Sequence, residues 1–492
     1  MHYKNSIFLL LFTTITSYAS SNINITPGII SLVAGDSSTN TIIISQQNSP
    51  SIVNLDIKGL PQGVTSTFSP KSISSNIGVS ILTINTTKEV LAGNYTIEIS
   101  GKGIITEPIK LEVKKDMSFI HPGILLSKVQ LDQMVKNVNS ELPIWKQALL
   151  NTQTSPLGKK DYVPSRLNSV NADDPKQSNA IINDANAAYT QALLWYITKD
   201  STYADNAIHI MDTWSEQFTE GFSGSNSMNL ASWTGDVWPR AAEIIRYTYL
   251  NNDNSSKWNN VAIERFENML EKQYVSIIHR GRPYGFYGGN LNASSAAALI
   301  NIGVFTNNTS VFLRGISMWR ATLPAYIYQV EDGPIPVPPL NWSASQSSST
   351  NLQKLWYNQE ALVNGLSQET CRDLGHVSWG ISALANGAET AKKQGIVLES
   401  EYILGTQNAV RMAHGIEFNS SLINNNSQIP LWLCNGNINL GSSVGTGEIL
   451  FNDLVNRRAM SLPQTASYLD KKRPTRASYF MVWETLTHYN NP

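Results

Sequence analysis

The sequence has little charge for its length and almost no net charge. Asp, Glu, Lys and Arg make up 15% of the 492 residues and leave a formal net charge of −1, whereas about 25% charged residues is usual in soluble domains. A chain without excess positive charge offers no attractive field to nucleic acid or to an anionic membrane surface. We therefore expect neither nucleic acid nor membrane insertion. A polyanionic partner would have to be met by local positive charge.

Cysteine is nearly absent, and metal-binding patterns are missing. The two cysteines, Cys371 and Cys434, are too few for a disulfide framework. They can pair in an oxidising compartment or remain two buried thiols, since apolar residues flank both. The chain has no HExxH, no paired Cys motif, no EF-hand loop, no GxSxG elbow and no P-loop. We therefore expect no metal and no cofactor.

Long apolar runs are also lacking, and the one near the start is short. Lys4 precedes the apolar segment 7–12, and the small residues around Ala19 suit a cleavage site, so residues 1–19 are predicted to be a signal peptide. The run is too short to span a bilayer. We expect an exported protein, secreted or periplasmic/extracellular, whose mature chain starts near Ser20; a monomer is favoured.

Residues 20–115 carry the pattern of an all-β domain. Runs rich in Ile, Val and Thr alternate with turn clusters such as Pro-Gln-Gly at 61–63. The predicted strands are residues 29–33, 41–45, 52–57, 78–84 and 94–99. Strands at such short intervals predict a β-sandwich, and the GLPQGVTSTFSP and LAGNYTIEISG segments resemble bacterial immunoglobulin-like modules. We interpret this domain as a spacer.

Residues 118–492 follow a helical period. The predicted helices are residues 183–199, 201–217, 239–250, 258–277, 293–305, 308–322, 361–393, 397–418 and 477–488. Repeated helix hairpins form either an open solenoid or a closed (α/α) toroid. The long, aromatic connections favour the toroid, with functional loops on one rim. The whole chain is thus predicted to be multidomain, an immunoglobulin-like sandwich followed by an all-α (α/α) toroid or barrel.

One stretch, residues 368–395, carries a concentration of reactive side chains. On a helical period Glu369, Arg372, His376 and Trp379 project from one face. Arg offers a planar fork for carboxylates, His moves protons near neutral pH, and Trp gives an apolar wall. This face suits a cleft for an anionic sugar. The alternative is a buried Glu–Arg pair beside a core histidine.

Three connections add aromatic, amide and arginine side chains that suit sugar binding. Segment 228–249 places Pro239 at a predicted helix start. Segment 279–305 ends in a small-residue helix that begins at Asn292. The Pro-rich segment 331–342 continues toward Tyr357. The candidate substrate-binding residues are Trp238, Arg240, Arg282, Tyr284, Asn290, Gln368 and Trp379. The alternative for each residue is ordinary packing, and for Asn292 it is an N-cap.

Several separated motifs resemble the alginate lyase superfamily. They are HPGILLSKVQLDQM, WPRAAEIIRYT, GNLNASSAAALINIGVF, MWRATLPAYIYQVEDGPIPVPP, EALVNGLSQETCRDLGHVSWGISA and YFMVWETLTH. The resemblance spans residues 118–490. It implies a secreted (α/α)-toroid polysaccharide lyase that cleaves a 1,4-linked polyuronate by β-elimination, with alginate as the first candidate and glucuronan as the second.

Carried onto this sequence, the resemblance implies catalytic roles for a few residues. Asn292 and Arg372 would neutralise the substrate carboxylate, and His376 would transfer a proton. The better-known alginate lyases have a His directly after that Asn, where this chain has Ala293, so the expected shuttle combines His376 with Tyr287 or Tyr357. The alternatives are a glycoside hydrolase that uses Asp373 or Glu369, and a non-catalytic carbohydrate-binding surface protein.

Overall fold

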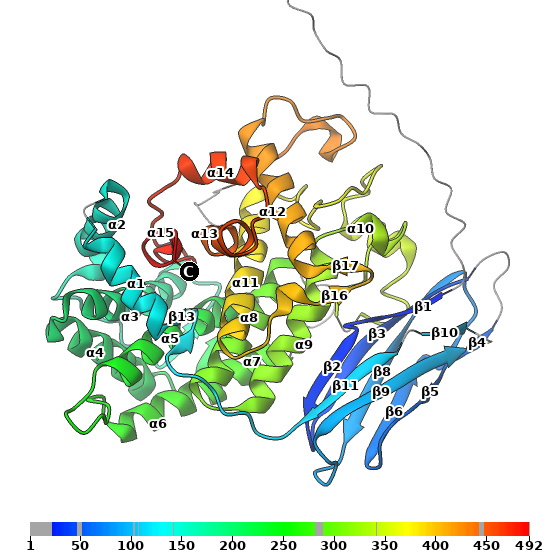
Figure 1. Cartoon of the computed structure of the whole chain (residues 1–492), viewed down its shortest axis with the longest axis horizontal. Coiled ribbons are helices and arrows are strands. Elements are labelled where there is room, and N and C mark those ends of the chain that lie inside the picture. The colour runs from blue at the N-terminus through cyan, green and yellow to red at the C-terminus, as the bar shows by residue number, and fades with distance from the viewer. Residues whose placement is uncertain are drawn as a thin grey trace, which may run out of the picture.

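The computed structural model describes residues 22–46, 52–101, 104–106, 108–140, 142–280, 289–340, 342–441 and 447–491. Strands fill the chain up to residue 114, and a helix-rich region follows, as the sequence predicts (Figure 1). The predicted signal peptide, residues 1–19, lies outside the described residues. None of the helices in these ranges combines the length and the apolar character that crossing a bilayer requires.

The N-terminal region consists of two packed sheets. The first has the strand order β1 (Asn22–Thr26), β3 (Ser37–Ser45), β8 (Ile77–Thr86) and β6 (Val64–Ser69). The second has the order β10 (Ile104–Ile105), β9 (Gly93–Gly101), β11 (Ile109–Lys114) and β2 (Ile29–Val33), and β5 (Asp56–Lys58) also pairs with β9. A small separate pair is formed by β4 (Val53–Asn54) and β7 (Ser72–Ile73).

Alternation along the strands builds the core of this sandwich. In β11, Ile109, Leu111 and Val113 are buried and the residues between them are more exposed, because successive side chains of a strand point to opposite faces. The buried faces of the two sheets meet in one hydrophobic cluster, which includes Ile42 of the first sheet and Leu111 of the second.

The helical region contains fifteen α-helices in the described ranges. They are α1 (Lys128–Val138), α2 (Pro143–Thr154), α3 (Pro175–Thr198), α4 (Ser201–Gln217), α5 (Ser227–Thr248), α6 (Asn260–Met269), α7 (Ser276–Arg280), α8 (Gly289–Phe305), α9 (Thr309–Tyr326), α10 (Ser349–Leu355), α11 (Leu374–Lys393), α12 (Asn408–Asn424), α13 (Glu448–Phe451), α14 (Pro463–Asp470) and α15 (Glu484–His488). Short strand pairs connect them: β12 (Gly123–Ile124) with β13 (Leu126–Ser127), β14 (Ser169–Asn171) with β15 (Gly221–Ser223), and β16 (Tyr402–Ile403) with β17 (Thr406–Gln407).

Helices α3, α5, α8 and α11 pack side by side in that order, and α4, α9 and α12 form a second layer against α3, α8 and α11. This arrangement is the predicted (α/α) toroid. Helix α8 fits between its neighbours because it is rich in small residues, and all the described side chains from Ala293 to Phe305 are buried. A Cβ atom at Gly303 would come within 2.4 Å of the Phe312 backbone nitrogen, so glycine permits the close approach of α8 and α9.

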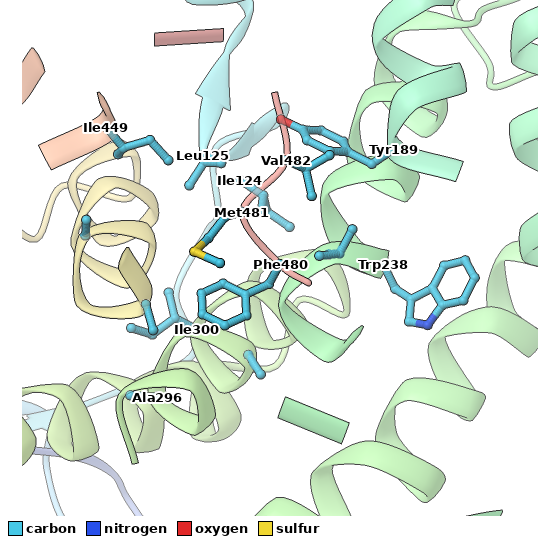
Figure 2. Close-up of a cluster of buried hydrophobic side chains, with 14 of the residues drawn as sticks. Ile124, Leu125, Tyr189, Trp238, Ala296, Ile300, Ile449, Phe480, Met481 and Val482 are labelled. Atoms are coloured by element: carbon cyan, nitrogen blue, oxygen red, sulfur yellow. The ribbon is translucent and has the colours of Figure 1, made fainter. Parts of the chain in front are cut away.

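The C-terminal segment runs through the interior of the toroid. Phe480, Met481 and Val482 are at most 2% exposed. They lie among hydrophobic side chains from several helices, including Tyr189 of α3 and Ile300 of α8 (Figure 2). The helix that follows, α15, packs against α1 and α13. The end of the described chain is therefore part of the core.

Several helices begin elsewhere than predicted, among them α3, α12 and α15, and two of these differences bear on the candidate site. Helix α5 starts twelve residues before position 239, so Pro239 lies inside it instead of at its first position. Helix α11 starts at Leu374 and not at residue 361, because the Asp373 side chain accepts the His376 backbone N–H and acts as the N-cap. Glu369 and Arg372 therefore lie in the turn before α11 and not on its face.

A disulfide bond joins Cys371 to Cys434, with 5.3 Å between the Cα atoms. The sequence left pairing and two free thiols equally open, and the structure has the pair. Because Cys371 lies between Glu369 and Arg372, the bond ties the turn before α11 to the segment that precedes α13.

Candidate active site

An open cavity of about 560 Å³ lies where α3, α5, α8 and α11 begin. The residues that face it include Asn290, Glu369, Arg372, His376, Trp379 and Tyr479. The lining also includes small polar side chains, such as Ser178, Asn179 and Asn229, and the carboxylate of Asp173. The described parts of the chain hold no group of three or more His, Cys, Asp or Glu side chains arranged for a metal ion.

Glu369 organises one side of the cavity. Its carboxylate is 4% exposed and accepts hydrogen bonds from the Asn290 backbone N–H and from Asn290 Nδ2, each at 2.9 Å. Arg372 Nη1 donates to it at 2.9 Å, and the buried Tyr326 hydroxyl donates at 3.1 Å. One buried carboxylate thereby fixes an amide and a guanidinium next to each other.

Arg372 supplies the positive charge of this site. Its side chain is 48% exposed, so the donors that do not reach Glu369 are accessible from the cavity. A guanidinium carries five N–H donors and an amide nitrogen carries two. Arg372 can therefore bind a ligand carboxylate while it stays anchored to Glu369, and Asn290, whose Nδ2 contacts both Glu369 oxygens, is held beside it.

His376 is oriented by the N-cap of its own helix. Its Nδ1 atom lies 2.6 Å from Asp373 Oδ2, while Asp373 Oδ1 accepts the His376 backbone N–H at 2.9 Å. A carboxylate can only accept, so the proton of a neutral imidazole is held on Nδ1. This leaves Nε2 as the free basic atom of a side chain that lines the cavity. A histidine held in this way is suited to taking up a proton.

An aromatic cluster forms the floor beside His376. The Trp379 ring lies 4.7 Å from the His376 ring and 4.7 Å from the Tyr479 ring, and Trp233 packs against both Trp379 and Tyr479. The indole N–H groups of Trp233 and Trp379 find no acceptor among the described residues. Both nitrogens are buried within the cluster, so neither is placed to donate to a ligand in the cavity.

The structure gathers some of the predicted site residues and separates others. Arg372, His376, Asn290 and Trp379 line the cavity, whereas Asn292 does not. Two residues along an α-helix turn the side chain by about 200°, so Asn290 and Asn292 leave α8 on different faces. The predicted role of Asn292 therefore fits Asn290 better.

The structure buries two of the residues that were predicted to bind substrate. Trp238 is 0% exposed and Arg240 is 1% exposed, so neither can reach a substrate. Arg240 pairs with the buried Asp236 at 2.5 Å and donates to the Phe480 carbonyl at 3.0 Å. The Trp238 indole N–H donates to the Tyr274 hydroxyl at 2.8 Å. Both residues belong to the toroid core.

The remaining candidates either do not line the cavity or lie outside the described residues. Gln368 is buried and donates to the Leu355 carbonyl instead of lining the cavity. Tyr357 is 42% exposed; partial burial, followed by the charge of Glu369, raises the pKa of its hydroxyl. Arg282, Tyr284 and Tyr287 lie outside the described residues.

Tyr479 was not predicted as a site residue, and Glu369, whose pairing with Arg372 was the alternative from the sequence, was not predicted to hold Asn290 as well. Tyr479 stands in the motif YFMVWETLTH, but it follows Arg372 by more than a hundred residues, and no local spacing links the two. Only the path of the C-terminal segment through the toroid brings them to one cavity. The motif YFMVWETLTH was the signal in the sequence that could have pointed to Tyr479.

Comparisons with known proteins bear on the fold of the helical region. Residues 130–337 match the family model described as alginate lyase. Among solved structures, alginate lyase A1-III from Sphingomonas species A1 is similar at a TM-score of 0.51, with 15% identity over 75% of this chain and 97% of that enzyme. A tyrosine-to-phenylalanine variant of alginate lyase A1-III complexed with a tetrasaccharide gives the same TM-score at 13% identity, over 75% and 97% of the two chains.

A histidine-to-alanine variant of A1-III, also complexed with a tetrasaccharide, matches at 14% identity and a TM-score of 0.51, over 75% of this chain and 96% of that one. A search of curated proteins finds no match. The structural likeness shows the fold, and the family model covers the segment that contains α3, α5 and α8. Residues 130–337 of this chain therefore match the alginate lyase family model, and the helical region has the fold of alginate lyase A1-III.

Proposed function

We propose that the protein is a secreted lyase that cleaves a 1,4-linked polyuronate by β-elimination, with alginate as the first candidate substrate and glucuronan as the second. The observation that carries the proposal is the meeting of Asn290, Arg372 and His376 in one cavity, with the first two held by Glu369. The predicted signal peptide supports export. The A1-III complexes with a tetrasaccharide support an oligosaccharide ligand.

The chemistry follows from the acidity of the C5 proton of a uronate. That proton becomes removable when the adjacent carboxylate is neutralised by hydrogen-bond donors, since charge develops there in the transition state. Arg372 and the Asn290 amide, which line the same cavity, supply those donors. His376 Nε2 takes the proton, the C5–H electrons form the C4=C5 double bond, and the C4–O4 bond breaks as a tyrosine hydroxyl protonates the departing oxygen.

The hydrolase alternative is less well supported by the same contacts. A glycosidase needs one carboxylic acid to protonate the leaving group and a second carboxylate for water or for the sugar. Glu369 and Asp373 instead hold Asn290, Arg372 and His376 by hydrogen bonds. Neither carboxylate is free for that chemistry.

The test is the ultraviolet absorbance of the unsaturated product. The purified protein, starting near Ser20, is incubated separately with polymannuronate, polyguluronate and glucuronan. We expect absorbance to rise on at least one polymer and the rise to be lost in His376→Ala. New reducing ends without a rise in absorbance would support a hydrolase instead. A folded protein that gives no signal in either assay would support a binding protein.

A further inference from the structure

We propose that Tyr479 is the catalytic acid that protonates the departing O4, in place of the predicted Tyr287 and Tyr357; this inference rests on the proposed lyase function. Among the described tyrosines, Tyr479 is the one that lines the cavity. Its hydroxyl has no hydrogen-bond partner within the described residues, and its ring is fixed between Trp233, at 4.9 Å, and Trp379, at 4.7 Å. The Tyr479 ring is therefore held in place, while its hydroxyl remains available to donate a proton.

The neighbouring tyrosines do not meet these conditions. The Tyr326 hydroxyl is fully buried and committed to Glu369 Oε2 and the His376 carbonyl, each at 3.1 Å. Burial raises the pKa of Tyr326 far above its usual range. Tyr357 lies outside the cavity wall. Neither hydroxyl combines access to the cavity with freedom from other partners.

The backbone around Tyr479 is held in an unusual conformation. Its φ is +50°, a left-handed value that non-glycine residues adopt infrequently. Ser478 and Met481 exchange two backbone hydrogen bonds of 2.8 and 2.9 Å around it. Unfavourable backbone angles that the surrounding structure maintains are found most often at functional sites. The turn therefore presents Tyr479 to the cavity.

Arg240 of α5 holds this turn in place. It donates to the Phe480 carbonyl at 3.0 Å, and its partner Asp236 accepts further hydrogen bonds from Asn301 of α8 and Asn386 of α11. Next along the chain, Phe480 and Met481 fill the hydrophobic centre of the toroid (Figure 2). The segment that carries Tyr479 is therefore anchored to three helices of the ring, and Arg240 is a positioning residue for it.

The proton balance needs no further reactant. His376 Nε2 takes the C5 proton, the C4–O4 bond breaks as the C4=C5 bond forms, and the Tyr479 hydroxyl proton passes to O4. The tyrosinate then regains a proton, and the imidazolium loses one, through water in the open cavity. A general acid contributes most when the leaving group is a poor one, and a sugar alkoxide is poor.

The experiment compares two leaving groups in Tyr479→Phe, on the polymer that the wild-type protein degrades and on a uronate glycoside with a dinitrophenyl ether at O4. We expect the variant to lose at least about 100-fold in kcat on the polymer and to stay within about threefold of wild type on the ether, because dinitrophenolate leaves without a proton. His376→Ala should lose activity on both substrates. Tyr402→Phe, at a 65% exposed surface position, is the matched control and should match wild type on both.

Equal losses of Tyr479→Phe on the two substrates would assign Tyr479 a structural role and overturn the proposal. Unchanged activity on the polymer would overturn it as well, with the lyase function intact. Absence of unsaturated product from the wild-type protein on all three polymers would instead remove the lyase function itself, and the acid role with it.

Discussion

Single residues in the cavity divide into those that would touch a substrate and those that hold them. Glu369 belongs to the second group, because all its hydrogen bonds go to protein donors. Asp373 has the same relation to His376. The arrangement places an amide, a guanidinium and an imidazole around one space, while the two carboxylates stay behind them.

Asn290 and Asn292 provide a direct test of which amide neutralises the substrate. Removing one donor that stabilises a developing charge costs about 10²–10³-fold in kcat, and Asn290 is the one of the two that faces the cavity. We expect Asn290→Ala to fall in that range and Asn292→Ala to keep most of the activity. Initial rates of unsaturated product formation would measure both. The reverse order would restore the assignment that the sequence alone suggests.

Replacing Glu369 by Gln should weaken both stability and activity. The variant keeps the size of the side chain but removes a charged acceptor from Asn290 and Arg372, and hydrogen bonds to charged groups contribute about 1.5–3 kcal/mol. We expect the free energy of unfolding to fall by about 2 kcal/mol and the rate to fall as Arg372 loses its anchor. Urea unfolding and initial rates would show this. A variant with wild-type rates would mean that Arg372 is positioned without Glu369.

At the scale of elements, the sequence predicted the kinds of structure better than their limits. Ser127 caps α1 and Asp200 caps α4, and such caps depend on a few adjacent residues. The starts of α5 and α11 were misplaced because a helical period extends into flanking turns and a tertiary contact or a cap decides where the helix begins. Asn290 and Arg372 were identified from local motifs, whereas Tyr479 depends on a long-range path that no local pattern contains.

The disulfide offers a prediction about the turn before α11. It closes a loop with a sequence separation of 63, and a cross-link of that size stabilises a protein by about 4 kcal/mol in the chain-entropy model. We expect the Cys371→Ser/Cys434→Ser double variant to unfold at lower denaturant concentration and to lose activity before it unfolds, because Cys371 adjoins Arg372. Activity that persists up to the unfolding transition would contradict this coupling.

The N-terminus of helix α13 makes a pH-dependent contact with Glu484 of α15. The fully buried Glu484 accepts the backbone N–H groups of Gly447 and Glu448, and burial raises its pKa from 4.5 to about 7. A raised carboxyl pKa means that the folded state binds more protons than the unfolded state between these values. Stability from this group is therefore complete below about pH 4.5 and is lost as the pH rises through 7.

Glu484→Gln should remove that loss, because the amide resembles the protonated acid. We expect the variant to match wild type near pH 4.5 and to exceed its free energy of unfolding at pH 8 by up to about 3 kcal/mol. Urea unfolding at both pH values measures the difference. A difference of the same size at both pH values would show that Glu484 does not titrate in this range.

At the scale of the whole molecule, the sandwich is fixed to the toroid and is not a loosely attached module. Strand β2 packs against α9, with the sandwich on one side of the ring (Figure 1). Arg320 of α9 is 3% exposed, donates to Ser31 Oγ at 2.9 Å and pairs with Glu401 through two hydrogen bonds of 2.6 and 2.8 Å. A spacer role remains our prediction, but Ser31 of the spacer accepts a hydrogen bond from an arginine whose ion pair lies within the toroid.

Arg320→Ala should therefore destabilise the protein strongly. Breaking a buried pair leaves the partner charge uncompensated and costs about 3–5 kcal/mol. Lys128→Ala is the control, since Lys128 pairs with Asp132 on the exposed surface of α1 and exposed pairs contribute at most about 1 kcal/mol. Calorimetry of both variants would compare them. Similar transition temperatures for the two would mean that the interface does not depend on Arg320.

The route of the C-terminal segment has a consequence for biosynthesis. The ring helices that surround Tyr479 all precede it in the chain, and domains begin to fold from their N-terminal parts during translation at about 5–20 residues per second. A nascent chain can thus assemble most of the ring before the ribosome has made the residues that fill its centre. The cavity gains its tyrosine only when that last stretch emerges and inserts, so activity should arise late in synthesis.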